Sequence, residues 1–252
     1  MARLNSEAPR LLERAVLGLE GSALLPGGGT LFLFNHLLQA ASTPDDPDLV
    51  FEFLVTSRSV ASGELATIGL GRHMVSEAPS SSMIFRPWSE SWMLPSNPAD
   101  DLAMMPFAGL RSHAAAKGWR WNTQEVTDGM LLKVGETIHV SATEPAAAYG
   151  YERSQPEQLL ANKRPELRRV RLTPEPNGSV SVSGVSPAFS GAPVLALSSV
   201  GSNQLRFVVV GMVGSVATGA PSESSSTLPL TGAWTIRRAA AEIHARLTQQ
   251  QH

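Results

Sequence analysis

Short runs of apolar residues, separated by clusters of glycine, proline and serine, continue along the chain to about residue 216. Runs of this length are typical of β-strands, and little helical periodicity lies between them. The run LVFEFLVT at residues 49–56 is the clearest example. The predicted strands include 31–34, 49–56, 83–85, 102–105, 137–141, 170–172, 180–182, 194–197 and 205–213. This pattern predicts an all-β barrel or sandwich.

Two segments near the ends of the chain place apolar residues at helical spacing instead. Residues 8–19 predict a short N-terminal helix, and the segment 21–30, which contains glycine and proline, ends it. Residues 233–247 predict an amphipathic C-terminal helix. The apolar face of that helix consists of Ile236, Ala240, Ile243 and Leu247.

Composition narrows the class of protein further. The 252 residues fit one larger all-β domain or two small subdomains, and an apolar fraction of 42% is sufficient for a core. Twenty basic and 22 acidic residues give a net charge of -2, which does not indicate a nucleic-acid or membrane-surface protein. The absence of cysteine excludes disulfides and thiolate metal sites and favours a reducing compartment. We see no secretory signal and no apolar run that spans a bilayer, so we expect a cytoplasmic protein.

Three motifs that carry candidate chemistry follow one another along the chain. They are FLVTSRSV at 53–60, DDLAMMPF at 100–107 and SPAFSGAPV at 186–194. A serine–glycine motif alone also occurs in ordinary turns, and an aspartate before a strand also caps turns. The order and spacing of all three motifs favour a joint function over three unrelated turns.

Together with further features, these motifs resemble the trypsin-like serine peptidases of chymotrypsin fold, in particular those of the bacterial cytoplasmic type. The further features are the glycine-rich strand entry GGGTLFLF, the tryptophan and prolines before Asp101, the strand VVVGMVGSV after the serine motif, and the C-terminal helix. The resemblance covers roughly residues 25–248. It implies an all-β fold of two six-stranded β-barrels, with the active site in the cleft between them and a C-terminal α-helix. The implied division is 1–24 as an N-terminal extension, 25–125 and 126–230 as barrels, and 231–252 as helix and tail.

Residue by residue, the resemblance assigns roles to seven positions. Ser190 matches the nucleophile, Asp101 matches the acid that orients the base, and Ser59 stands where the family has its histidine base. The oxyanion hole is expected from the amides of Ala188 and Ser190. The residues expected to line the specificity pocket are Gly214, Ser215 and Val216.

Two of these positions depart from the family pattern. A serine at position 59 is not a general base near neutral pH, and loss of the base costs on the order of a million-fold in turnover. Asp101 then needs another donor, for which Ser59 is the candidate, because an unpaired buried carboxylate is costly. Ala188 replaces a glycine whose amide faces the developing oxyanion, so the usual geometry is in doubt.

None of the six histidines lies in a recognisable base motif. They are His36, His73, His113, His139, His244 and His252. His73 follows a predicted hairpin after Ser59 and could in principle fold back toward it. We favour the interpretation of His73 as a surface or strand-end residue.

These departures lead to a ranked set of functions. The first is a catalytically impaired serine peptidase homologue that binds a protein or peptide in the cleft between the barrels. The alternative is an active serine endopeptidase with Ser190 as nucleophile and a non-standard base, or an active peptidase inactivated by substitution of its histidine. No motif predicts a metal or a cofactor. The basic run at 162–172 is interpreted as a solvated edge, so we expect neither a nucleic-acid nor a membrane partner.

Overall fold

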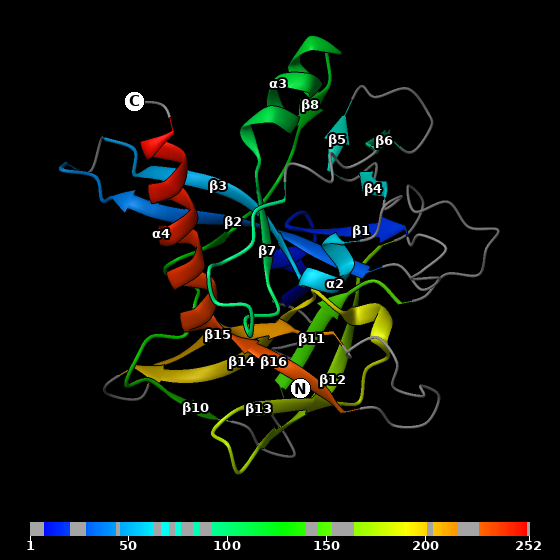
Figure 1. The fold of residues 1–252 in the computed structure, drawn as a ribbon, viewed down its shortest axis with the longest axis vertical. Helices are drawn as coiled ribbons and strands as arrows, with labels where there is room; N and C mark the ends of the chain where they lie inside the picture. Colours follow the sequence, from blue (N-terminus) through cyan, green and yellow to red (C-terminus); the bar gives the residue numbers. More distant parts are fainter. Residues whose placement is uncertain are drawn as a thin grey trace.

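The computed structural model describes most of the chain in segments that together define two β-sheets. The described residues are 8–20, 29–43, 46–62, 67–70, 74–76, 83–85, 92–139, 146–152, 164–200, 204–215 and 227–250. Their strands form two seven-stranded sheets and one two-stranded sheet. Figure 1 shows the two larger sheets with the C-terminal helix running along one side of the molecule.

The first large sheet is built from the N-terminal half of the chain and has the strand order β6-β4-β1-β2-β3-β7. Its neighbours are antiparallel, and the short strand β9 pairs with β2 in parallel. Within the described residues this sheet stays open between β6 and β7. The strands are β1 (Val16–Glu20), β2 (Gly29–Gln39), β3 (Leu49–Thr56), β4 (Thr67–Leu70), β6 (Met83–Phe85), β7 (Ala103–Pro106) and β9 (Val126–Thr127).

The second large sheet closes into a six-stranded barrel. Its order is β11-β12-β13-β16-β15-β14, and closure follows because β14 pairs with both β15 and β11. The seventh strand, β10, pairs with the end of β14. The strands are β10 (Thr137–His139), β11 (Ala146–Gly150), β12 (Glu166–Pro174), β13 (Val180–Ser183), β14 (Pro193–Val200), β15 (Gln204–Val213) and β16 (Leu228–Gly232). Separately, β5 (Val75–Ser76) pairs with β8 (Arg120–Trp121).

Both sheets use the same connectivity. With the short strands β9 and β10 set aside, the first three strands of each sheet pair in sequence, the last strand pairs with the third, and the fourth strand returns to pair with the first. The sequence shows no repeat that would reveal this shared order, because strand pairing depends on backbone groups that every residue carries. The predicted all-β fold of two barrel-type sheets followed by a helix is confirmed, with the first sheet forming a half-barrel.

Three apolar clusters fill the interior. One lies within the first sheet, a second lies inside the closed barrel, and the largest joins both sheets to the C-terminal helix. That helix, α4 (Ala233–Gln249), contacts β2 of the first sheet and β15 and β16 of the second. Its buried face carries Ile236, Ala240 and Ile243, as predicted, and Leu247 packs against the same cluster while partly buried.

The N-terminal helix is shorter than predicted. Residues 8–12 are helical, but residues 16–20 form β1, which lies between β2 and β4. Val16 and Leu17 pair with β2 and are fully buried, so strand pairing in the folded chain outweighs the local helical spacing. Because β1 precedes residue 25 and β9 follows residue 125, the first sheet extends beyond both of the predicted limits of its domain.

Three short helical elements complete the described chain. They are α2 (Arg58–Ala61), α3 (Ala108–Ala116) and the 3-10 turn η3 (Pro187–Phe189). The sequence pattern did not predict α3. Among the described residues, none of the helices has the length and apolar character needed to cross a membrane.

Candidate functional site

Ser190 follows directly after η3, and the closed barrel's strand β14 begins three residues later. The residue is 4% exposed. The next residue, Gly191, has a φ of +88°, and a Cβ at that position would stand 1.9 Å from the carbonyl oxygen of Thr30. Only glycine fits a left-handed position with such close backbone contact, so packing requires the glycine that follows Ser190.

Thr30 of β2 attaches this turn to the first sheet. Its N–H donates to the carbonyl oxygen of Ser190 over 2.8 Å. Its own carbonyl accepts the Thr56 hydroxyl over 2.7 Å, and its hydroxyl accepts the N–H of Tyr151 over 3.0 Å. Thr30 is fully buried, so these bonds form without competition from water. One residue therefore joins the serine turn to β3 and to the end of β11.

Asp101 precedes β7 and is held by three donors. Its Oδ1 accepts the main-chain N–H of Arg58 over 2.9 Å. Its Oδ2 accepts both the N–H and the hydroxyl of Ser215, each over 2.6 Å. The prediction that Ser59 would donate to this carboxylate is wrong, because the Ser59 hydroxyl instead lies 3.5 Å from the hydroxyl of Ser57. Main-chain groups and Ser215 make the side-chain donor at position 59 unnecessary.

A single peptide group separates Ser190 from Asp101. The Ser190 hydroxyl donates to the carbonyl oxygen of Gly214 over 3.2 Å. The N–H of the same peptide group, which belongs to Ser215, donates to Asp101. The structure therefore brings Ser190, Asp101, Gly214 and Ser215 together, whereas Val216 lies outside the described residues. The hydroxyl proton of Ser190 faces a neutral amide carbonyl, which is a poor proton acceptor.

The predicted oxyanion donors lie in or next to η3. The N–H of Ser190 donates to the carbonyl oxygen of Pro187 over 3.0 Å, and the N–H of Phe189 donates to Ser186 over the same distance. Ala188 is buried between them. These bonds are those of a 3-10 turn. In this conformation the N–H of Ser190 is occupied and does not face an incoming oxyanion.

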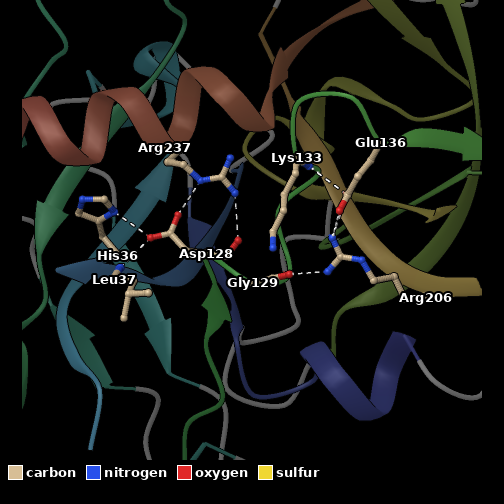
Figure 2. A network of polar contacts seen from close by, with 8 residues as sticks. All are labelled: His36, Leu37, Asp128, Gly129, Lys133, Glu136, Arg206 and Arg237. Atoms are coloured by element: carbon tan, nitrogen blue, oxygen red, sulfur yellow. Dashed lines mark hydrogen bonds and ion pairs between the residues drawn. The ribbon is translucent and has the colours of Figure 1, made fainter. Parts of the chain in front are cut away.

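A histidine–aspartate pair exists elsewhere in the molecule, as Figure 2 shows. His36 Nδ1 lies 2.9 Å from Asp128 Oδ2, which also accepts the N–H of Leu37 over 2.6 Å. Arg237 of α4 donates from Nε to Asp128 Oδ1 over 2.9 Å and from Nη2 to the Asp128 carbonyl over 3.0 Å. Burial alone would raise the pKa of the Asp128 carboxyl, but these hydrogen bonds lower it below its ordinary value. The pair ties β2 to α4.

The remaining described histidines also lie in other surroundings. His113 packs edge-on against Trp119, with ring centroids 5.7 Å apart, and His244 packs against Phe51 at 5.0 Å. His139 is in β10 and pairs with β14. Among the described residues, no histidine hydrogen-bonds the Ser190 hydroxyl. His73 and His252 lie outside the described residues.

Sequence reasoning missed two residues that shape the site. Thr30 follows the glycine-rich segment before β2, and its threonine hydroxyl was the available signal. Arg58 stands inside the motif VTSRSV next to Ser59, and its charge was the available signal. The spacing of residues in the sequence does not predict these roles, because each role depends on which main-chain groups the residue meets in the folded chain.

Comparisons with known proteins found solved structures that are similar to this chain only at a low level. No family model matches the chain, and no curated protein sequence matches it significantly. The HtrA-type protease AlgW with a decapeptide is 13% identical with a TM-score of 0.42, over 94% of this chain and 67% of that chain. The scabies mite inactivated protease paralogue S-I1 is 11% identical with a TM-score of 0.40, over 94% of this chain and 96% of that chain. Similarity at this level transfers no residue role.

Proposed function

We propose that this chain is a trypsin-like serine peptidase homologue that is catalytically impaired and acts by binding a protein or peptide at the candidate site. The observation that carries the proposal is the hydrogen bond of the Ser190 hydroxyl to the Gly214 carbonyl. It pairs the expected nucleophile with a group that cannot accept its proton.

Proton transfer is the first obstacle to hydrolysis. A serine attacks a peptide carbonyl only when a base takes its hydroxyl proton, and the base must lie within hydrogen-bond reach. Asp101 is the nearest carboxylate in the hydrogen-bond chain, but the Gly214–Ser215 peptide group stands between it and Ser190. By analogy with removal of the base from a catalytic triad, we expect turnover lower by about a million-fold.

Stabilisation of the oxyanion is the second obstacle. The N–H of Ser190 donates to Pro187 within η3, so it is unavailable to a tetrahedral intermediate in this conformation. Loss of one such donor costs roughly 10²–10³ in kcat. Both obstacles raise the free energy of the transition state for hydrolysis. Neither of them disturbs the residues that surround the site.

Retention of the surrounding structure supports a binding role. The close contact at Gly191 and the bonds of Thr30 hold the serine turn in one conformation. The three donors to Asp101 satisfy its carboxylate without an imidazole. A preorganised site of this kind binds a ligand at low conformational cost. Binding requires neither a base nor a free oxyanion donor, so the described site has the groups that a binding role needs.

Labelling with a fluorophosphonate probe tests the loss of reactivity. The purified full chain is incubated with the probe alongside Ser190→Ala, and folding is checked by circular dichroism. We expect no labelling of either protein above background. Labelling that Ser190→Ala abolishes would instead support an active serine endopeptidase that uses Ser190 with a non-standard base.

The variant Ser59→His tests whether the missing base is the only defect. We expect no recovered peptidase activity on a fluorogenic peptide mixture, because the N–H of Ser190 remains bonded to Pro187. The double variant Ser59→His with Ser190→Ala is the matched control. Turnover that appears in Ser59→His and disappears in the double variant would mean an otherwise intact peptidase with a substituted histidine.

A further inference from the structure

The joined ends of β2 and β3 carry apolar side chains that the fold leaves exposed. Leu37 is 39% exposed, Leu49 56% and Val50 36%. Leu37 and Val50 lie opposite each other in the β2–β3 register, so their side chains share one face of the hairpin. Leu49 lies on the other face, where Phe51 packs against His244 of α4. We call these three exposed residues the hairpin end, which lies beyond α4 in Figure 1.

The β2 edge of this hairpin is occupied. There β9 pairs with Phe34 and Asn35, and the N–H of Leu37 donates to Asp128 Oδ2 over 2.6 Å. Because the N–H of Leu37 faces away from β3, Leu37 and Val50 form a non-hydrogen-bonded pair of the antiparallel ladder. It follows that the N–H and the carbonyl of Val50 also face outward, away from β2.

The β3 edge lacks this cover at the hairpin end. Its register with β7 begins at Phe53, and the N–H of Phe107 donates to the carbonyl of Glu52 over 2.9 Å. The chain then leaves the sheet, because α3 begins at Ala108. Among the described residues, no group bonds the outward N–H or carbonyl of Val50. An added strand could pair with these two groups and contact apolar side chains on both faces.

The charge of the hairpin indicates what kind of segment fits this edge. Residues 37–53 include four acidic residues and no lysine or arginine. Arg111 of α3 pairs with Glu52 but also with Glu125, so it brings no net positive charge. Asp46 accepts a hydroxyl and Asp48 a main-chain N–H, both of them neutral donors. The hairpin end is thus apolar with an acidic border, which favours a cationic partner and disfavours a second copy of itself.

We propose that the hairpin end binds an extended, basic segment of a partner protein, which adds as a strand to the edge of β3. The main chain of the partner pairs with Val50, and its apolar side chains contact Leu37 and Leu49 on the two faces. Its lysines or arginines face the aspartates that precede Leu49. Leu37 lies seven residues beyond Thr30, whose N–H bonds Ser190, which is about 23 Å along the strand. The surface is therefore separate from the candidate site, and the inference does not depend on the function proposed for that site.

A fluorescein-labelled peptide of sequence KVKIKVK tests the proposal on the purified full chain by fluorescence anisotropy. Three matched peptides separate the contributions. EVEIEVE reverses the charge, KSKSKSK removes the apolar side chains, and KVKIKVK with alternate amides N-methylated cannot pair as a strand. We expect the unmodified KVKIKVK to bind about ten times more tightly than each matched form, which corresponds to the loss of one or two hydrogen bonds or of one apolar contact. Raising the salt concentration should weaken its binding.

Variants of the hairpin end locate the bound peptide. Val50→Pro removes an N–H that the described fold does not use, as is tolerated at a strand edge, and should weaken KVKIKVK binding about tenfold. Leu37→Ser removes an exposed apolar contact and should also weaken it, so it tests the surface even if Val50→Pro does not fold. Val134→Ser is the matched control, because Val134 is 87% exposed elsewhere in the molecule, and it should bind as the wild type does. Circular dichroism and thermal unfolding check the fold of each variant.

The double variant Asp46→Asn with Asp48→Asn tests the role of charge. Asparagine keeps a side-chain oxygen that accepts the same two hydrogen bonds, so the loop retains these contacts. The double variant should lose most of the preference for KVKIKVK over EVEIEVE. It should keep the preference for KVKIKVK over its N-methylated form.

Three results would overturn the proposal. One is absence of KVKIKVK binding to the folded wild-type protein, or binding that stays at full strength in the folded variants Val50→Pro and Leu37→Ser. Another is equal binding of the unmodified and N-methylated peptides, which would mean charge attraction without strand addition. The third is a wild-type dimer in analytical ultracentrifugation that Val50→Pro converts into a monomer, which would assign the edge to a second copy of this chain.

Discussion

Asp101 and Asp128 are two carboxylates of the same fold that are held by different kinds of donor. Asp101 accepts two main-chain N–H groups and one hydroxyl, all of them neutral. Asp128 accepts one main-chain N–H, but its other partners are the side chains of His36 and Arg237. Each carboxylate thus has three donors, and only the second faces a permanent cation.

The difference explains how the candidate site stays folded without a histidine. A carboxylate that depended on an imidazole would be left uncompensated when the imidazole is absent. At Asp101 the compensation comes from peptide groups whose positions are set by α2 and by the end of β15, so position 59 is free to change. At Asp128 the imidazole and the guanidinium tie β2 to α4 and serve the architecture (Figure 2).

Removal of the Asp101 carboxylate should give the largest loss of stability. In Asp101→Ala, the N–H groups of Arg58 and Ser215 lose their acceptor, and neither can turn away because both belong to the main chain. We expect the free energy of unfolding to fall by about 3 kcal/mol. Urea unfolding followed by circular dichroism measures it. A loss below about 1 kcal/mol would mean that water replaces the carboxylate, and the contrast with Asp128 would disappear.

Removal of the Asp128 carboxylate should cost less, although it breaks contacts with a charged partner. In Asp128→Ala, the side chains of His36 and Arg237 can reorient toward water, so only the N–H of Leu37 stays fixed. We expect a loss of about 2 kcal/mol, measured in the same urea experiment. A loss larger than that of Asp101→Ala would reverse the comparison and make side-chain donors the stronger anchors.

Lowering the pH should also reduce the free energy of unfolding through the Asp128 contacts, but by less than the two alanine substitutions do. Burial favours a higher pKa for this carboxyl, but the bonds from His36, Leu37 and Arg237 lower it below the ordinary value of 3.8. A lowered folded-state pKa contributes stability that is present above the ordinary value and is lost as the pH falls through the folded one. Unfolding curves between about pH 5 and pH 3 should therefore show a steeper loss for the wild type than for Asp128→Asn. Parallel curves would argue against a stabilising ionised form.

Substitution of Ser59 should have the smallest effect. Its hydroxyl contacts Ser57 at 3.5 Å and does not reach Asp101. Ser59→Ala should change the free energy of unfolding by less than about 0.5 kcal/mol, as is usual for side chains without a specific partner. Ser215→Ala, which removes one bond to Asp101, is the comparison variant and should cost about 1 kcal/mol. Equal losses would restore the hypothesis that Ser59 supports the carboxylate.

The local pattern of apolar residues predicted those strands whose own residues favour the β conformation. The run at 49–56 coincides with β3, and the predicted C-terminal helix coincides with α4. In contrast, β11 consists of Ala146–Gly150 and carries three alanines, which have low β-propensity. It becomes a strand because β12 and β14 pair with its two edges. The same cause converts residues 16–20 from an expected helix into β1.

The candidate site was predicted in part for a similar reason. Motif order selected Ser190, Asp101 and Ser215, and the structure brings these residues together around one peptide group. The expected donor Ser59 was wrong, because two main-chain N–H groups and the Ser215 hydroxyl already donate to Asp101. Main-chain N–H groups are present at every residue and leave no mark in the sequence.

Side-chain type and local periodicity were sufficient to predict the all-β class, the C-terminal helix and the positions that carry candidate chemistry. The folded chain is needed to see that the Ser190 hydroxyl donates to the carbonyl of Gly214 and that Asp101 is held by main-chain N–H groups. Both contacts join groups from distant segments, which sheet pairing and packing over the whole chain bring together.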